Sequence, residues 1–217
     1  MKISENTLKV LKNFSEINSG LVLRTGNVQK TINMDKSILC EAELEDNIPI
    51  QFGIYDLPQF LGNVTSFDNP DIDFGDKSLT MTDGTVGLHY YSSAIGLITS
   101  PPDKELTMKQ VDLRFTLTDS VWQRIRRLAA TNGFPNISIL GKNGELRLLA
   151  HEKANDTSNS ASIKLADHTG EDCSVTFKFE NLKMIADDYD VEVMLNGFAK
   201  FAAKNKKIKY WIAVETK

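Results

Sequence analysis

Three arginines lie within four positions of one short segment, "DSVWQRIRRLAATNG" (119–133): Arg124, Arg126 and Arg127. Clustered guanidinium groups are well suited to binding phosphate. At about 100° per residue, Arg126 and Arg127 point away from the apolar side of a helix and Arg124 lies on its flank. The residues expected on the apolar side are Val121, Trp122, Ile125, Leu128 and Ala129. The segment predicts an amphipathic helix with a basic outer face.

Carboxylates and histidines form weaker patterns. Acidic residues cluster at "DDYD" (187–190) and "DNPDIDFGD" (68–76). Neither segment has the ligand spacing and terminal Glu of a calcium-binding loop, so we expect acidic turns. His89, His151 and His168 are scattered, and zinc-peptidase, phosphate-loop and nucleophile-elbow motifs do not occur. We therefore expect no catalytic residue, no metal site and no cofactor.

The two cysteines, Cys40 and Cys173, have no C-x-x-C partner. We expect both to be small buried apolar side chains rather than zinc ligands or a redox pair. In "HTGEDC", Cys173 follows His168 closely, but nearness in sequence is a poor guide to a Cys–His dyad. We expect this nearness to be incidental.

The composition is that of an ordinary folded protein. The chain has 217 residues, of which 41% are hydrophobic and 25% charged, with a net charge of −4. Disorder is therefore not expected. No apolar run approaches the roughly 20 residues that cross a bilayer. The start "MKISENTLKVLKNF" lacks the apolar core and cleavage site of a secretion signal, so we expect the protein to stay in the cytosol where it is made.

The charge is divided unevenly between the halves of the chain. Residues 1–105 carry 8 Lys and Arg against 15 Asp and Glu, a net charge of −7, whereas residues 106–217 carry 17 against 14, a net charge of +3. Pro101 and Pro102 break any regular element at the same place. We expect two domains, 1–105 and 106–217.

The first half begins with a helix in "SENTLKVLKNFSEINSG" (4–20), capped by Ser4. A strand, "GLVLRTGN", follows. A second helix in "YDLPQFLGNV" is expected behind Asp56, because its apolar residues recur at helical spacing. The strand pair "SLTMTD" and "TVGLHYY" then completes the half.

The second half repeats this order, starting from the arginine helix. "NISILGKNGELRLLAH" predicts a hairpin turning at Asn143-Gly144. "ENLKMIADD" predicts a short helix behind Asn181, followed by the strands "DVEVMLNG" and "KIKYWIAVE". Two α+β domains, each with short helices on an antiparallel sheet, are expected. We expect Trp122 and Trp211 in the cores.

Three segments resemble the DNA polymerase sliding clamps of T-even-type bacteriophages: "LKNFSEINSG" (11–20), "IYDLPQFLG" (54–62) and "YWIAVE" (210–215). They occur in the same order and at similar distances from the chain ends. The resemblance implies duplicated clamp domains, with antiparallel sheets outside and short helices lining the inner face of a ring. It also implies a non-catalytic homotrimer around duplex DNA, acting in the host cytoplasm, with a polymerase and a clamp-loader ATPase as partners.

This resemblance assigns roles to particular residues. The DNA-facing cations would be Lys9, Lys12, Arg124, Arg126, Arg127 and Lys183. The pocket for a partner's hydrophobic tail would involve Leu106, Met108 and Val111 near the connector.

Other interpretations remain open from the residues alone. Exposed Lys and Arg on an amphipathic helix are often no more than a solvated face. The basic run "NKKIKY" (205–210) fits a solvated turn better than a contact with DNA or a loader. A monomeric phosphate-binding protein or enzyme would need acid, base or metal residues beside Arg124 and Arg127. A structural phage protein could assemble through its strand edges.

Overall fold

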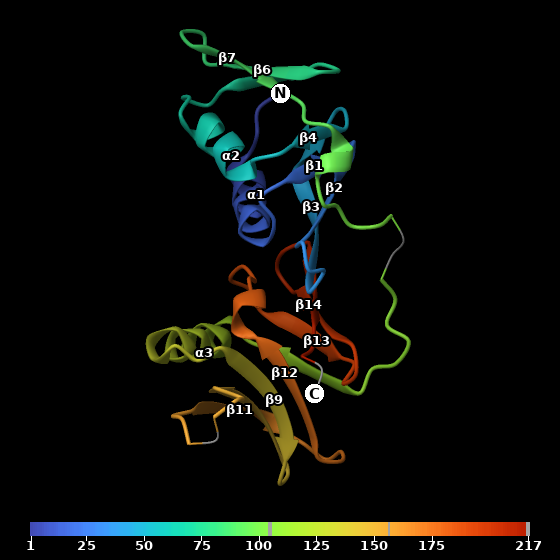
Figure 1. The fold of residues 1–217 in the computed structure, drawn as a ribbon, viewed down its shortest axis with the longest axis vertical. Helices are drawn as coiled ribbons and strands as arrows, with labels where there is room; N and C mark the ends of the chain where they lie inside the picture. The colour runs from blue at the N-terminus through green and yellow to red at the C-terminus, as the bar shows by residue number, and fades with distance from the viewer. Residues whose placement is uncertain (104–105, 156, 216–217) are drawn as a thin grey trace. The chain divides into compact units, whose positions relative to one another are not determined.

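The chain forms two compact units, Met1–Lys104 and Glu105–Lys217, in the computed structural model (Figure 1). The structure describes residues 1–103, 106–155 and 157–215. Both units combine short helices with antiparallel strands.

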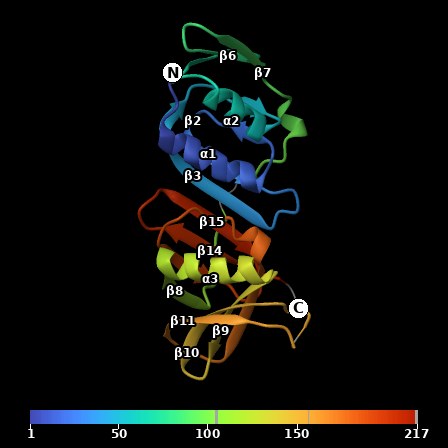
Figure 2. The ribbon, with the colours of Figure 1, turned by 90° about the vertical axis from the view of Figure 1, so that its left-hand side faces the viewer.

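In its described residues, 1–103, the first unit holds two α-helices, a 3₁₀ turn and seven strands. Strand β1 pairs with β4, β2 with β3, and β6 lies between β5 and β7. The helices α1 and α2 lie side by side (Figure 2). The elements in chain order are α1 (Glu5–Ile17), β1 (Leu21–Leu23), β2 (Gly26–Ile32), β3 (Ile38–Ile48), β4 (Phe52–Ile54), α2 (Leu57–Thr65), β5 (Asp71–Phe74), β6 (Ser78–Thr82), β7 (Gly87–Tyr91) and η1 (Ile95–Leu97).

Both helices of the first unit begin where their capping residues predict. The Ser4 hydroxyl accepts a hydrogen bond from the Thr7 amide, and the Asp56 carboxylate accepts one from the Gln59 amide. Each cap satisfies an amide that has no partner inside its helix. The helices bury one face each, including Leu11 and Phe14 from α1.

The part of the second unit that the structure describes holds one α-helix, a 3₁₀ turn and eight strands. One sheet has the order β11-β10-β9-β12. In the other, β13 lies between β8 and β14, and β14 also pairs with β15. The elements are β8 (Leu113–Leu117), α3 (Asp119–Asn132), β9 (Asn136–Lys142), β10 (Glu145–His151), β11 (Ala161–Asp167), β12 (Cys173–Lys178), η2 (Phe179–Asn181), β13 (Tyr189–Val193), β14 (Phe198–Ala203) and β15 (Ile208–Ala213).

Helix α3 is held against the sheet by its apolar face. Trp122, Ile125 and Ala129 are buried, and Trp122 lines the same small apolar cavity as Phe115 of β8. Each large buried side chain contributes about 1.5–3 kcal/mol. The helix ends at Gly133, whose φ of 67° is left-handed and favours glycine.

Three expectations about the second unit are wrong in part. The segment 182–188 is irregular rather than helical: Leu182 and Met184 are both buried, whereas a helix turning about 100° per residue would place residues two apart on different sides. Leu128 is 37% exposed, because it lies at the edge of the apolar face of α3. Cys40 is buried as expected, but Cys173 is only half-buried.

Candidate nucleic-acid interface

The three arginines of α3 lie on its exposed side. Arg124, Arg126 and Arg127 are all exposed, whereas Trp122 and Ile125 of the same helix are 1% and 0% exposed. The helix therefore presents its guanidinium groups to solvent while its apolar side chains fix its position. This arrangement suits the binding of an extended row of phosphates.

The first turn of α3 is capped from another part of the chain. Thr118 precedes the helix, and its hydroxyl lies 3.2 Å from the hydroxyl of Ser120. The backbone N–H of Asp119 instead donates to the carboxylate of Asp188, with an N···O distance of 2.7 Å. The acidic segment "DDYD" is thus in direct contact with the arginine helix. It is not the expected turn throughout, because its last two residues begin β13, and the acidic segment 68–76 likewise contains strand β5.

Lys9 and Lys12 of α1 are exposed, as the sequence predicts. Lys9 lies 3.8 Å from the carboxylate of Glu5, one turn earlier, and both side chains are largely in solvent. An exposed pair of this kind contributes little to stability. The two lysines therefore form a weakly basic face on the first unit.

Lys183 is placed differently from the expectation. It follows η2 in the non-helical segment, where it is half-buried and already has an interaction partner. The predicted helix would have carried it on an outer face. Of the six proposed cations, Lys183 is the one that lies off a helix.

The connector residues Leu106, Met108 and Val111 lie in irregular chain before β8. Leu106 is 41% exposed, and the other two are partly exposed. Just beyond them, the Asp112 carboxylate accepts a hydrogen bond from the Leu195 amide at 2.8 Å. The end of the connector is therefore fixed to the second unit.

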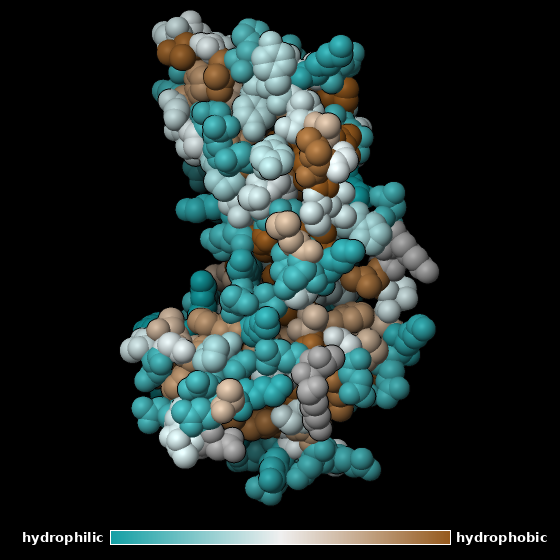
Figure 3. Space-filling view, in the orientation of Figure 1, coloured by the Kyte–Doolittle hydropathy of each residue, from teal (hydrophilic) through white to brown (hydrophobic). Residues whose placement is uncertain are grey.

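Apolar side chains are also exposed on the first unit, at positions to which the sequence assigned no binding role. Leu97 and Ile95 of η1 are 72% and 41% exposed, and Tyr55 is 63% exposed. A brown patch is visible over η1 in Figure 3. The amide of Ser93, just before η1, donates to the Gly53 carbonyl at 2.9 Å, which holds this segment against β4.

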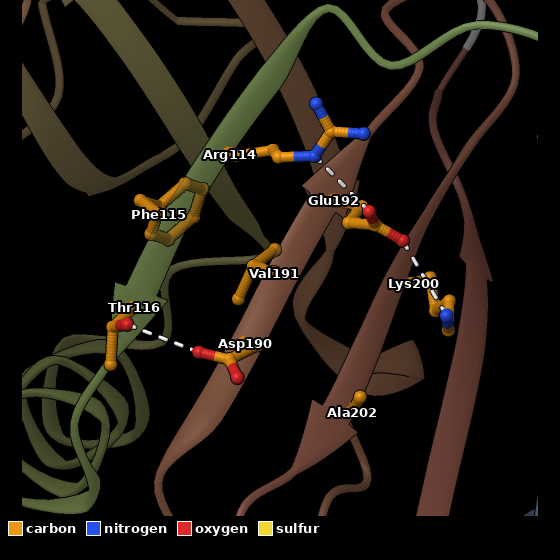
Figure 4. Close-up of a pocket in the computed structure, with 8 residues that line it drawn as sticks. All are labelled: Arg114, Phe115, Thr116, Asp190, Val191, Glu192, Lys200 and Ala202. Carbon is orange, nitrogen blue, oxygen red and sulfur yellow. Dashed lines mark hydrogen bonds and ion pairs between the residues drawn. The ribbon is translucent and has the colours of Figure 1, made fainter.

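A groove of about 450 Å³ runs across the polar face of β8, β13 and β14. Glu192 bonds Arg114 at 3.2 Å and Lys200 at 3.4 Å, and Asp190 accepts a hydrogen bond from Thr116 at 3.2 Å (Figure 4). The Arg114 hydrogen bond is the main cause that lowers the pKa of Glu192. The alternation of polar residues in these strands was the available sequence signal, although it does not reveal which residues pair across strands.

The structure brings His168 and Cys173 together without making a reactive pair. The Cys173 sulfur lies 3.9 Å from Nε2 of His168, which also contacts the Glu171 carbonyl at 2.9 Å. Burial raises the pKa of the Cys173 thiol, which disfavours the thiolate that nucleophilic attack or metal binding needs. Among the described residues, no three His, Cys, Asp or Glu side chains are grouped closely enough to hold a metal ion.

The fold is similar to that of several solved structures. The chain is similar to the proliferating cell nuclear antigen of Thermococcus kodakaraensis, with a TM-score of 0.69 at 11% identity, covering 96% of this chain and 95% of that one. It is also similar to the DNA polymerase III subunit beta of Pseudomonas aeruginosa, with a TM-score of 0.65 at 15% identity, covering 98% of this chain and 63% of that one. These likenesses show the sliding-clamp fold.

Sequence comparison gives the family. The chain is 30% identical to the sliding clamp of Vibrio phage KVP40, covering 99% of both chains. It is 26% identical to that of Enterobacteria phage T4, covering 99% of this chain and 97% of the relative. Residues 3–95 match the DNA polymerase processivity factor family. The chain belongs to the family of bacteriophage sliding clamps, which are DNA polymerase processivity factors.

The helices that the structure describes are all too short or too polar to cross a membrane.

Proposed function

We propose that three copies of this chain close head to tail into a ring around duplex DNA, and that the ring tethers the replicative polymerase. The protein acts without catalysis of its own, and a separate ATP-driven loader opens and closes the ring. Its site of action is the cytoplasm of the infected bacterial host. The family and the clamp fold support this proposal.

The exposed arginine face of α3 carries the proposal. Arg124, Arg126 and Arg127 face solvent on a chain whose net charge is −4. Together with Lys9 and Lys12 they would attract phosphates without reading bases, since phosphate contacts position a protein but do not specify sequence. A lining with few cations binds weakly and slides, while the closed ring prevents escape.

Two domains at residues 1–105 and 106–217, as the sequence predicts, would favour head-to-tail assembly. The opposite net charges of −7 and +3 favour contact between unlike halves of neighbouring copies. Strands β7 and β11 are the last strands of their sheets, and edge strands present backbone groups that another strand can pair with. We place the contact between β7 of one copy and β11 of the next, which generates a ring when the rotation closes.

Tyr91 at the end of β7 is 74% exposed, so a substitution there tests the proposed contact between β7 and β11. Tyr91→Asp should shift the protein from trimer to monomer, because the carboxylate would be buried against a neighbouring strand. Light scattering over a range of concentrations measures the mass. Tyr55→Asp is the matched control, since Tyr55 is similarly exposed, at 63%, but lies outside β7. A monomer mass for the unmodified protein at every salt and concentration would contradict the ring.

Partner binding is proposed at the connector. Leu106, Met108 and Val111 would receive a short hydrophobic tail of the polymerase, with a few apolar anchors giving most of the affinity. Leu106 is the most accessible of the three.

A further inference from the structure

The segment 185–190 contacts the arginine helix and the lysine-rich turn after β14. Asp188 accepts the hydrogen bond from the Asp119 N–H through its side chain, and its own carbonyl accepts one from the Lys204 amide at 2.8 Å. One residue therefore joins the start of α3 to the end of β14. Asp188 is 69 positions from Asp119 in sequence, so this contact depends on the tertiary fold.

Asp187 fixes the same segment from the other side. Its carboxylate, whose side chain is 0% exposed, accepts hydrogen bonds from the backbone and side-chain nitrogens of Asn205 at 3.1 and 2.9 Å. Lys206 Nζ lies 3.3 Å from the carboxylate and donates to the Ala186 carbonyl at 2.6 Å. Burial raises the pKa of Asp187, but the Asn205 and Lys206 contacts outweigh it, and the pKa is lowered overall. The carboxylate is ionised and held on several sides.

The carboxylate of Asp188 lies at the N-terminus of α3, where a negative charge is favourable. The first amides of a helix lack partners inside it, and the helix dipole adds a partial positive charge there. A carboxylate satisfies these amides and is attracted by this charge, and replacing a capping side chain by Ala destabilises the start of a helix. The Thr118 hydroxyl contacts the Ser120 hydroxyl, and the Asp188 carboxylate is the side-chain acceptor for the Asp119 amide.

We propose that Asp188 is a positioning residue for DNA binding: it fixes the first turn of α3 and thereby the direction in which Arg124, Arg126 and Arg127 meet the phosphates. Asp187 keeps Asp188 in place by anchoring the adjoining chain to Asn205 and Lys206. This inference rests on the proposed function, in which the arginine face of α3 contacts DNA.

If Asp188 positions α3, removing its carboxylate should change DNA affinity in the direction opposite to that expected from its charge alone. Removing a carboxylate from a DNA-binding protein ordinarily strengthens its attraction to phosphates. If Asp188 acts as a positioning residue, Asp188→Ala weakens DNA association instead, because the first turn frays and the arginines no longer keep a fixed direction. Asp188→Asn removes the same charge but keeps an oxygen that accepts the Asp119 hydrogen bond, so it should restore binding.

The experiment combines hydrogen exchange with DNA binding on the full chain. In Asp188→Ala, amide exchange in the first turn of α3 should become faster, and association with unrelated duplexes should weaken about three- to tenfold. Asp188→Asn should bind at least as well as the unmodified protein. Asp172→Ala, which removes an exposed carboxylate of the same unit, is the control and should not weaken binding.

A double-mutant cycle separates this claim from the proposed function. In the triple variant Arg124→Ala, Arg126→Ala, Arg127→Ala, adding Asp188→Ala should not weaken DNA association further. A second outcome is that the triple variant binds DNA less tightly while Asp188→Ala alone binds normally or better. In that case Asp188 is not a positioning residue, but the arginine face of α3 still contacts DNA. If Asp188→Ala weakens binding equally with and without the arginines, it acts by general destabilisation and the positioning role is again wrong. If the triple variant binds DNA normally, the arginine face of α3 does not contact DNA, and Asp188 cannot position it for binding.

Discussion

Arg124, Arg126 and Arg127 owe their exposure to the residues on the other side of their helix. Trp122, at 1% exposure, and Ile125, at 0%, anchor α3 in the core of its unit. The arginines are consequently not needed to hold the helix in place. Their charge is available for an external partner, which we propose is the phosphate backbone of DNA.

Replacing the three arginines by Ala should leave the fold intact and weaken DNA association to a similar degree for unrelated sequences. The plot of log K against log salt should become shallower by about 0.9 for each phosphate that the protein no longer neutralises. Fluorescence anisotropy at several salt concentrations measures both quantities, and circular dichroism checks the fold. An unchanged slope would mean that these arginines do not contact phosphates.

At the scale of elements, the ends of helices are set by single residues. Gly133 ends α3 with a φ of 67°, a conformation that is strained for residues with a Cβ atom. Gly62 lies inside α2, and a Cβ added there would meet nothing within 4 Å. The same substitution should therefore have opposite effects at the two positions.

Gly133→Ala should destabilise the protein by about 1 kcal/mol, because the left-handed conformation becomes costly. Gly62→Ala should stabilise it by about 0.5–1 kcal/mol, because alanine loses less backbone entropy in a helix. Thermal or denaturant unfolding of the two variants gives the comparison directly. A decrease of stability in both variants would contradict the helical environment described for Gly62.

Local sequence signals predicted much of the element order. The Ser4 and Asp56 caps and the hairpin at Asn143-Gly144 depend on neighbouring residues, and each was predicted correctly. The capping signal of Asn181 predicts a helix over 182–188, whereas the tertiary core buries both Leu182 and Met184, which do not lie on one face of a helix.

Less of the candidate nucleic-acid interface than of the element order could be predicted from the sequence. The arginine face follows from helical periodicity, and its exposure agrees with the prediction for Arg124, Arg126 and Arg127. The capping contact of Asp188 was not predictable, because its partner lies far away in sequence. The cross-strand contacts of Glu192 were missed for the same reason, since register determines them.

At the scale of the whole molecule, a clamp must also hold its polymerase. Leu106→Asp combined with Met108→Asp should abolish binding of a polymerase tail peptide, because apolar anchors would meet carboxylates. The paired variant should still associate with DNA, since neither residue lies on α3. Calorimetry with the tail peptide and a processivity assay give the result. If peptide affinity and processivity are unchanged, the polymerase does not bind at Leu106 and Met108.

We propose that a closed ring, rather than affinity, retains the clamp on DNA. The most direct measurement compares clamp loaded by its loader on circular DNA with the same sample after the circle is cut. At salt that abolishes binding of the free protein, the clamp should remain on the intact circle and leave after linearisation. Equally fast dissociation from intact and cut circles would contradict the ring, even if every arginine of α3 contributed to binding.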